Sequence, residues 1–301
     1  MAGWRGVRAL VTGATGFIGS HLVSRLTGLG AVVHAVSRQV HADDAATWHV
    51  ADLCDADQVG AVIRAAAPAV VFHLASEVTG GREVRLVRPT LESNLDSAVN
   101  LLTAVADAVP NGRLVLAGSV EEPRPEDGDV VACSPYAVAK WAVSGYARMF
   151  HQLWDVPVTT LRIGMVYGPG QQDLRKLIPY VTTALLRGES PELTSGTRLV
   201  DWIYVDDVVD AFLAAASSAA APGRVFDIAS GSQLSIRDTI ELLAKIIGAQ
   251  QQPRFGAIAD RPLDRAQVAD IGLAGELLDW RPRTDLETGL RRTADWYSAN
   301  P

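Results

Sequence analysis

The chain has 301 residues, of which 48% are hydrophobic and 20% are charged, and its formal net charge is −7. This length and composition indicate one large globular domain, or a large domain with a smaller lobe, and they exclude a disordered chain. An acidic chain without a basic cluster cannot neutralise a phosphate backbone, so nucleic-acid binding is excluded, whereas small anionic ligands need only a few aimed groups.

The two cysteines, Cys54 and Cys133, are far apart and have no CxxC spacing. They favour neither a disulfide scaffold nor a zinc site, and they fit a reducing compartment. The histidines are scattered, so no metal is expected. Residues 1–8 are too short for a signal peptide, and apolar stretches such as 211–221 are too short to span a membrane. We therefore expect a cytoplasmic protein that does not interact with membranes.

The first half of the chain alternates short apolar runs, typical of strands buried in a parallel sheet, with helical patterns. Strands are expected at 7–12, 31–36, 69–74, 114–117 and 158–163, with another before Asp52, and helices at 17–29, 55–67, 91–109 and 135–153. This alternation predicts an α/β fold with a Rossmann-type, doubly wound parallel sheet and right-handed crossovers.

The pattern becomes less regular after Tyr167. Further elements are expected as helices at 173–187, 208–217, 236–247, 271–278 and 286–297, and as strands at 201–205 and 224–228. Asp206 or Asp207 is expected to cap the helix at 208–217. We predict a dinucleotide-binding Rossmann domain with the catalytic residues at 1–165. Residues 166–301 should form mainly a smaller substrate-binding lobe, with some segments returning to the first domain.

A glycine-rich loop separates the first expected strand from the first expected helix. Gly13, Gly16 and Gly19 are spaced three residues apart, so the backbone can turn sharply and approach a pyrophosphate, while helix N–H groups face the negative charge. The same segment contains Thr15, Phe17 and Ile18. A plain glycine-rich turn is the alternative, but the position directly after an N-terminal strand favours a dinucleotide site.

The end of the second strand determines which dinucleotide is expected. It carries Ser37 and Arg38, which can donate to a 2′-phosphate, in place of the acidic residue that would bind a ribose hydroxyl. NADP(H) is therefore preferred. NAD(H) remains the alternative, because Asp43 and Asp44 follow closely and can reach the ribose. Asp52, next to Leu53, is a candidate acceptor for the adenine amino group or, alternatively, a helix-entry acid.

Tyr136 and Lys140 lie four residues apart at the start of an expected helix, which puts both side chains on one face. The lysine is expected to lower the pKa of the tyrosine and to hold the nicotinamide ribose. Ser119 follows the strand at 114–117, at the sheet edge where open α/β folds bind ligands, and its hydroxyl is a candidate to fix a substrate oxygen. The YxxxK spacing alone arises by chance on amphipathic helices, but its occurrence with the glycine loop and Ser119 favours a catalytic set.

With these motifs the chain resembles extended short-chain dehydrogenase/reductases of the NAD(P)-dependent nucleotide-sugar epimerase/dehydratase family. The resembling segments are 13–19, 71–76, 94–102, Ser119, 136–140, 161–170, 204–208 and 279–282. The resemblance implies that Leu74, Ala75, Ser76 and Asn94 also line the cofactor. It further implies a nucleotide-diphosphate sugar under the C-terminal lobe and a homodimer joined through helices.

Within the family, residues 117–122 are similar to the Gly-Ser-x-Glu-Glu segment of reductases of nucleotide-diphosphate-4-keto-6-deoxyhexoses. Val120 stands where the dehydratases carry a polar residue and cannot supply an acid. Glu121 is a candidate acid or base, with a surface charge as the alternative. The resemblance also makes Arg198 and Arg261 candidates for binding the diphosphate.

Met165 stands where the family often has Asn, and Val200 where an Arg commonly precedes the strand. We expect an NADPH-dependent 4-ketoreductase of an activated deoxysugar, in which Ser119, Tyr136 and Lys140 act on the keto group. Three alternatives remain: an epimerase with tightly bound NAD, a dinucleotide-binding protein without activity, and a reductase of a non-sugar carbonyl.

Overall fold

The computed structural model of the chain describes residues 3–41, 44–124, 131–260 and 269–300. The chain divides into two compact units. The first unit contains Met1–Ile163, Val209–Asp227 and Gly272–Trp280, and the second contains Gly164–Val208, Ile228–Ile271 and Arg281–Pro301. Two stretches from the second half of the sequence therefore belong to the first unit.

The first unit is built on a seven-stranded sheet in the order β10-β6-β5-β4-β1-β2-β3. Its strands are β1 (Arg8–Thr12), β2 (Val32–Ser37), β3 (Thr47–Val50), β4 (Val70–His73), β5 (Arg113–Ser119), β6 (Val158–Ile163) and β10 (Val225–Ile228). The pairs from β3 to β6 are parallel, with Val11 opposite Ala35 on one side and Phe72 on the other. The α/β fold with a Rossmann-type parallel sheet is confirmed.

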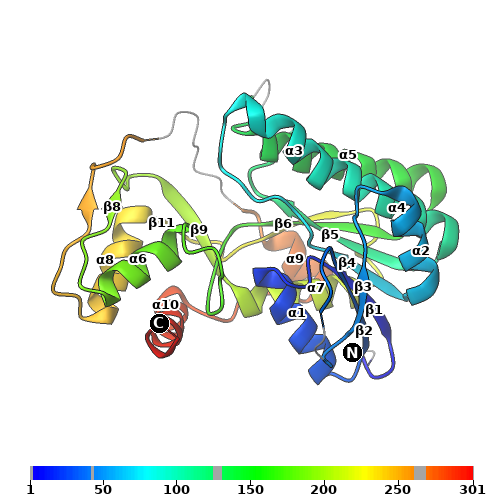
Figure 1. The fold of residues 1–301 in the computed structure, drawn as a ribbon, viewed down its shortest axis with the longest axis horizontal. Helices are drawn as coiled ribbons and strands as arrows, with labels where there is room; N and C mark the ends of the chain where they lie inside the picture. Colours follow the sequence, from blue (N-terminus) through cyan, green and yellow to red (C-terminus); the bar gives the residue numbers. More distant parts are fainter. Residues whose placement is uncertain (1–2, 42–43, 125–130, 261–268, 301) are drawn as a thin grey trace. The chain divides into compact units, whose positions relative to one another are not determined.

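Helices cover both faces of this sheet (Figure 1). One face carries α2 (Ala56–Ala66), α4 (Ser97–Ala108) and α5 (Pro135–Trp154), and the other carries α1 (Phe17–Gly28) and α9 (Gly272–Leu278). The helix starts follow local chemistry. The Asp55 side chain accepts from the backbone N–H groups of Asp57 and Gln58, and the Ser134 side chain accepts from Ala137 N before a proline in the first turn.

The helix expected at 91–109 begins earlier and is interrupted. The helical segment consists of η1 (Val84–Leu86), α3 (Val87–Leu91), a π-helical turn η2 (Glu92–Asp96) and α4. A π turn adds one residue to a helical turn, and such turns often occur at functional sites. Here the turn contains Asn94, which is 1% exposed.

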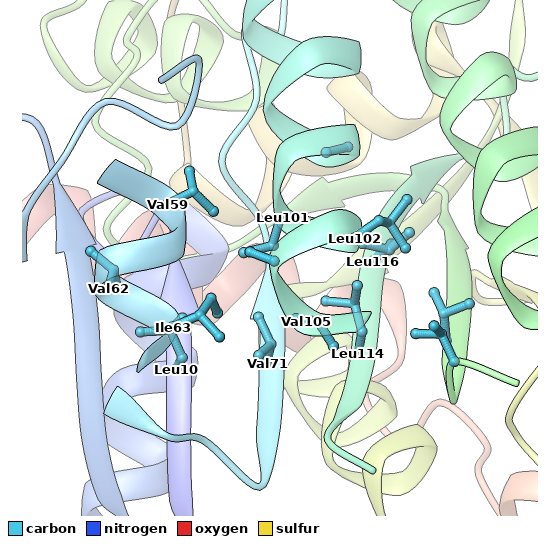
Figure 2. Packing of buried hydrophobic residues seen from close by; sticks show 14 of the residues in the cluster. Leu10, Val59, Val62, Ile63, Val71, Leu101, Leu102, Val105, Leu114 and Leu116 are labelled. Carbon is cyan, nitrogen blue, oxygen red and sulfur yellow. The ribbon is translucent and has the colours of Figure 1, made fainter. Parts of the chain in front are cut away.

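The core of the first unit lies between the sheet and the helices α2, α4 and α5. Leu101, Leu102 and Val105 of α4 pack above Val71 of β4 and Leu114 of β5 (Figure 2). α2 adds Val59, Val62 and Ile63, which lie about one helical turn apart on one face, to the same cluster. Apolar side chains at helical spacing thus bury one stripe of each helix against a sheet that is itself apolar.

The second unit has two small sheets and its own apolar cluster. Its strands are β7 (Met165–Tyr167), β9 (Leu199–Tyr204) and β11 (Gln233–Ser235) in one sheet, and β8 (Glu192–Leu193) and β12 (Arg254–Phe255) in the other. Its helices are α6 (Leu177–Leu186), α8 (Ile236–Ile247) and α10 (Leu286–Ala299). The core includes Ile240, Leu243 and Leu290, each 0% exposed, and Trp202.

The helix expected at 208–217 is α7 (Val205–Ser217), whose residues fall in both units. The expectation that Asp206 or Asp207 caps this helix is wrong, because both lie inside its first turn. The Asp207 carboxylate instead accepts from the backbone N–H groups of Arg283 and Thr284, each at 3.0 Å. Within the described residues, no helix combines the length and the apolar character needed to cross a membrane.

Candidate active site

The glycine loop lies at the point where the strand order of the sheet reverses. β1 pairs with β2 on one side and with β4 on the other, and open α/β sheets bind ligands beyond the carboxyl ends of such strands. Gly13 has a φ of +66°, and a Cβ atom there would lie 2.6 Å from Ala75 N. A Cβ atom at Gly19 would collide with the Gly13 carbonyl oxygen. Only glycine fits these two positions.

The start of α1 is suited to bind a phosphate. Gly16 is the residue before the helix, no side chain caps it, and the first turn carries no acidic residue. The first N–H groups of the helix are therefore not used by side chains, and the helix dipole favours an anion there. Thr15 is exposed at this end, and Phe17 and Ile18 are partly buried. The loop and the helix start thus fit the pyrophosphate of a dinucleotide.

Of the residues expected to choose the dinucleotide, Ser37 and Asp52 make local hydrogen bonds. The Ser37 hydroxyl accepts from Gln39 N at 3.1 Å and lies 3.1 Å from His41 Nε2. Arg38 is exposed. Asp52 accepts from Cys54 N at 2.9 Å, which shapes the turn before α2, while Leu53 is partly buried. Asp43 lies outside the described residues.

A buried polar network supports the loop after β4. Thr12 Oγ1 lies 2.8 Å from His73 Nδ1 and accepts from Ala75 N at 3.2 Å. Burial and, second, the Lys140 charge lower the pKa of His73 to about 3, so this imidazole is neutral at physiological pH. The network fixes the segment Leu74–Ser76 against the glycine loop.

Asn94 ties the same segment to the helices. Its Oδ1 accepts from Ser76 Oγ and from Glu77 N, each at 2.8 Å, and its Nδ2 donates to the Glu77 carbonyl oxygen at 3.2 Å. The π turn that carries Asn94 brings this amide to the end of β4. Asn94 therefore holds the loop through hydrogen bonds, which is one way for it to shape a cofactor site.

The structure brings Ser119, Tyr136 and Lys140 together at the end of β5. Ser119 is the last residue of the strand, and its side chain acts to lower the pKa of the Tyr136 phenol. Lys140 is 3% exposed, donates to the Ala117 carbonyl oxygen at 2.8 Å, and has its Nζ 5.7 Å from the centre of the Tyr136 ring. The arrangement brings a phenol, an amine and a hydroxyl together at the end of β5.

The electrostatics of the pair differ from the expectation that Lys140 lowers the pKa of Tyr136. Burial and, second, the charge of Glu121 raise the pKa of Tyr136 above its ordinary value, and only the Ser119 side chain acts to lower it. Burial also lowers the pKa of Lys140 to about 8. Tyr136 is therefore protonated at neutral pH, which is the form that can donate a proton.

The two glutamates after Ser119 have different environments. Glu121 is partly exposed, its N–H donates to Ser119 Oγ at 3.1 Å, and one carboxylate oxygen lies 3.8 Å from Cys133 Sγ. Glu122 is 2% exposed and contacts the Ser119 backbone and Ser144. Glu122 is a site residue that the sequence motifs do not predict. The signal available was a second acidic residue directly after a buried strand.

Of the two arginines expected to bind a diphosphate, Arg198 belongs to the second unit. Arg198 directly precedes β9, and its backbone carbonyl oxygen accepts from Ile236 N at 3.0 Å. Arg261 lies outside the described residues. Their assignment to the substrate remains a prediction.

The chain is similar to known proteins along nearly its whole length. Residues 9–229 match the NAD dependent epimerase/dehydratase family. The chain is 31% identical to a UDP-glucose 4-epimerase of Mycolicibacterium smegmatis (97% and 98% of the two chains covered) and 31% identical to a dTDP-glucose 4,6-dehydratase of Actinoplanes sp. (98% of each covered). A crystal structure of UDP-glucose 4-epimerase with UDP-glucose from Thermotoga maritima aligns with a TM-score of 0.89 at 28% identity, covering 97% of this chain and 99% of that one.

The family model matches more than half of the chain, and two relatives are more than 30% identical to it along nearly its whole length. The protein belongs to the NAD dependent epimerase/dehydratase family.

Proposed function

We propose that the protein is a 4-epimerase of a nucleotide-diphosphate sugar, acting through a nicotinamide dinucleotide. The observation that carries the proposal is the assembly of Ser119, Tyr136 and Lys140 beside a glycine loop that fits a pyrophosphate. The similarity to a UDP-glucose 4-epimerase along nearly the entire chain supports the reaction, and the structure solved with UDP-glucose supports the substrate class.

The bound dinucleotide would supply hydride transfer at a carbinol or keto carbon. The chain's own residues would handle the oxygen and its proton. Ser119 would fix the oxygen by a hydrogen bond, and Tyr136 would take or give the proton. Lys140 would hold the nicotinamide ribose. These roles need the three groups close together, as they are at the end of β5.

The second candidate is an NADPH-dependent 4-ketoreductase of a nucleotide-activated deoxysugar. Two features favour it: Val120 provides no acid where the dehydratases have a polar residue, and Ser37 and Arg38 stand at the end of β2 without an acidic neighbour in that strand. An enzyme with net reduction needs fresh hydride in each turnover, and a 2′-phosphate at Arg38 agrees with that need.

One experiment separates the candidates. The purified protein is incubated with UDP-glucose or UDP-galactose without added cofactor, and the two sugars are quantified; its bound dinucleotide is released by denaturation and identified. Interconversion with co-purifying NAD supports the epimerase. NADPH consumption with a nucleotide-4-keto-6-deoxyhexose, and no interconversion, supports the reductase. Failure of both reactions, in a protein that binds the dinucleotide, refutes both candidates.

The cofactor choice has its own test. If Arg38 binds a 2′-phosphate, Arg38→Ala should weaken NADPH binding by about tenfold or more and leave NADH binding unchanged, because a charge-assisted contact contributes about 1.5–3 kcal/mol. Equal effects on the two dinucleotides would exclude this role. The exposed Arg187 of the second unit provides a matched control.

A homodimer is also proposed. Helix α5 carries the exposed apolar residues Val138, Trp141, Tyr146, Leu153 and Trp154. Large aromatic side chains on one helix favour a protein interface over a solvated face. Light scattering at the mass of two chains, reduced to one chain in Trp154→Asp, would support a dimer through α5.

A further inference from the structure

Glu122 is a buried carboxyl group with two specific partners. Its side chain is at the end of β5 and the residue is 2% exposed. One oxygen accepts from Ser119 N at 2.7 Å, and the other accepts from Ser144 Oγ at 2.6 Å. Both distances are short, as expected for hydrogen bonds to an ionised carboxylate. A buried carboxyl group costs stability unless such partners satisfy it.

The neighbouring glycine makes room for this group. A Cβ atom at Gly118 would lie 2.5 Å from Glu122 Oε1 and 2.8 Å from Thr160 Cγ2. The φ of Gly118 is not in the left-handed region, so the reason for glycine here is space and not backbone conformation. The absence of a side chain at Gly118 therefore leaves the space that the Glu122 carboxylate occupies.

The partner serine lies on the catalytic face of α5. Tyr136, Lys140 and Ser144 follow one another at intervals of four residues, so they form one stripe of the helix. Glu122 contacts the last member of this stripe and, with its other oxygen, the backbone of Ser119. The carboxylate therefore connects the strand that carries the serine to the helix that carries the tyrosine and the lysine.

The charges around Glu122 come from three elements. Lys140 of α5 and Arg162 of β6 both act to lower its pKa, whereas burial, the larger effect, raises it. Arg162 and Arg124 are each paired with Asp227 of β10 at 2.7 Å. A cavity of about 200 Å³ borders the group and is lined by Glu122, Pro123, Trp141, Ser144, Arg148, Arg162 and Val225. Such a volume can hold water, which helps a buried carboxylate to remain ionised.

We propose that Glu122 is a positioning residue for Ser119, Tyr136 and Lys140, joining the end of β5 to α5 and balancing the lysine charge. The proposal rests on the proposed function, because it assigns the role relative to that reaction. It also has an electrostatic consequence. The negative charge raises the pKa of both Lys140 and Tyr136, so its removal should lower the pKa of each.

Two variants separate the hydrogen bonds from the charge. In Glu122→Gln the amide oxygen still accepts from Ser119 N and the amide nitrogen can donate to Ser144 Oγ, but the charge is lost. Glu122→Val removes both. Asp107→Asn, at an exposed position of α4, removes one carboxylate elsewhere and is the control. For each protein we would measure turnover against pH, and hydrogen–deuterium exchange of peptides covering 113–122.

Glu122→Gln should shift the limb of the kcat profile that follows Lys140, whose pKa is about 8, to lower pH by on the order of one unit, with unchanged exchange. Glu122→Val should lower kcat by about tenfold or more and speed exchange at the end of β5, with the affinity for the dinucleotide retained. Asp107→Asn should match the wild type.

The exchange measurement needs no substrate, so it distinguishes the two proposals. If the wild type converts no nucleotide sugar but Glu122→Val still loses protection at 113–122, the proposed function fails and the positioning role stands. Wild-type exchange in Glu122→Val would overturn the positioning role. A wild-type pH profile in Glu122→Gln would overturn the charge-balancing role.

Discussion

Replacing Gly13 with alanine should destabilise the first unit and remove its response to the dinucleotide. Gly13 has a φ of +66°, and a Cβ atom there would lie 2.6 Å from Ala75 N and 2.7 Å from Leu74 C. These are backbone atoms of the loop after β4, so no side-chain rotation relieves the contact. The backbone of the loop or of the glycine turn has to move.

The expected loss in the free energy of unfolding has two parts. A non-glycine residue in the left-handed region costs about 1–2 kcal/mol. Forcing an extra carbon into a packed site costs about 1–3 kcal/mol. The total is about 2–5 kcal/mol, and for a chain of this size each kcal/mol lowers Tm by about 2 °C. We therefore expect Gly13→Ala to unfold about 4–10 °C below the wild type.

Gly6→Ala is the matched control. Gly6 has a φ of +75°, but no atom lies within 4 Å of a Cβ atom built there. It should show the backbone strain alone. The assay is thermal unfolding with and without NAD and NADP. At a hundredfold excess over Kd, a dinucleotide should stabilise the wild type and Gly6→Ala by about 2.7 kcal/mol and should not stabilise Gly13→Ala. Equal Tm values for the two variants, with a retained dinucleotide shift in Gly13→Ala, would refute the reasoning.

Three further predictions concern side chains of the first unit. Tyr136→Phe should lower turnover by about 10²–10⁴-fold with an unchanged Tm and dinucleotide affinity, and retained turnover would exclude a proton-transfer role. Asp227→Asn should lower the free energy of unfolding, measured in urea, by about 3–5 kcal/mol, because Arg124 and Arg162 lose the buried carboxylate that both contact. Glu192→Gln, in the exposed pair with Arg254, is the control and should lower it by less than about 1 kcal/mol. Burial lowers the pKa of Lys140 from 10.5 to about 8, so between these values the unfolded chain retains a proton that the folded chain has released. Relative to Lys140→Met, the wild type should therefore gain on the order of 3 kcal/mol as pH rises through this window, and parallel stability curves would contradict the shift.

The parts of the site that the sequence predicts consist of residues that are close together in the chain. The glycine loop lies within seven residues between a strand and a helix, and Tyr136 and Lys140 are one helical turn apart. The periodicity of the chain is enough to place such groups, because the strand or helix that carries them fixes their directions. The sequence predicts Ser119 just beyond its strand, whereas the structure makes it the last residue of that strand.

The remaining parts depend on tertiary contacts. Glu122 and Ser144 are 22 residues apart, and only the packing of α5 on β5 brings them to hydrogen-bonding distance. The π turn at Asn94 shifts hydrogen bonds inside a helix without changing its apolar pattern. The two-residue strands β8 and β12 are too short to show an alternation. The raised pKa of Tyr136 likewise follows from burial and from Glu121, neither of which the YxxxK spacing contains.

The opposed pKa shifts of Tyr136 and Lys140 bear on how one catalytic set serves both oxidation and reduction. Burial disfavours the phenolate and the ammonium alike, so the chain alone holds Tyr136 as an acid and Lys140 near the point of losing its proton. Reduction of a keto group needs that acid. Oxidation of a carbinol needs the phenolate. Stabilising the phenolate requires more positive charge nearby than Lys140 provides. An oxidised nicotinamide would carry such a charge. Removing the negative charge of Glu121 or Glu122 would also lower the pKa of Tyr136 and so favour the phenolate. The glutamates after Ser119 therefore favour the protonated tyrosine, and in the proposed reaction the balance between the two directions of hydride transfer would depend on them as well as on the cofactor.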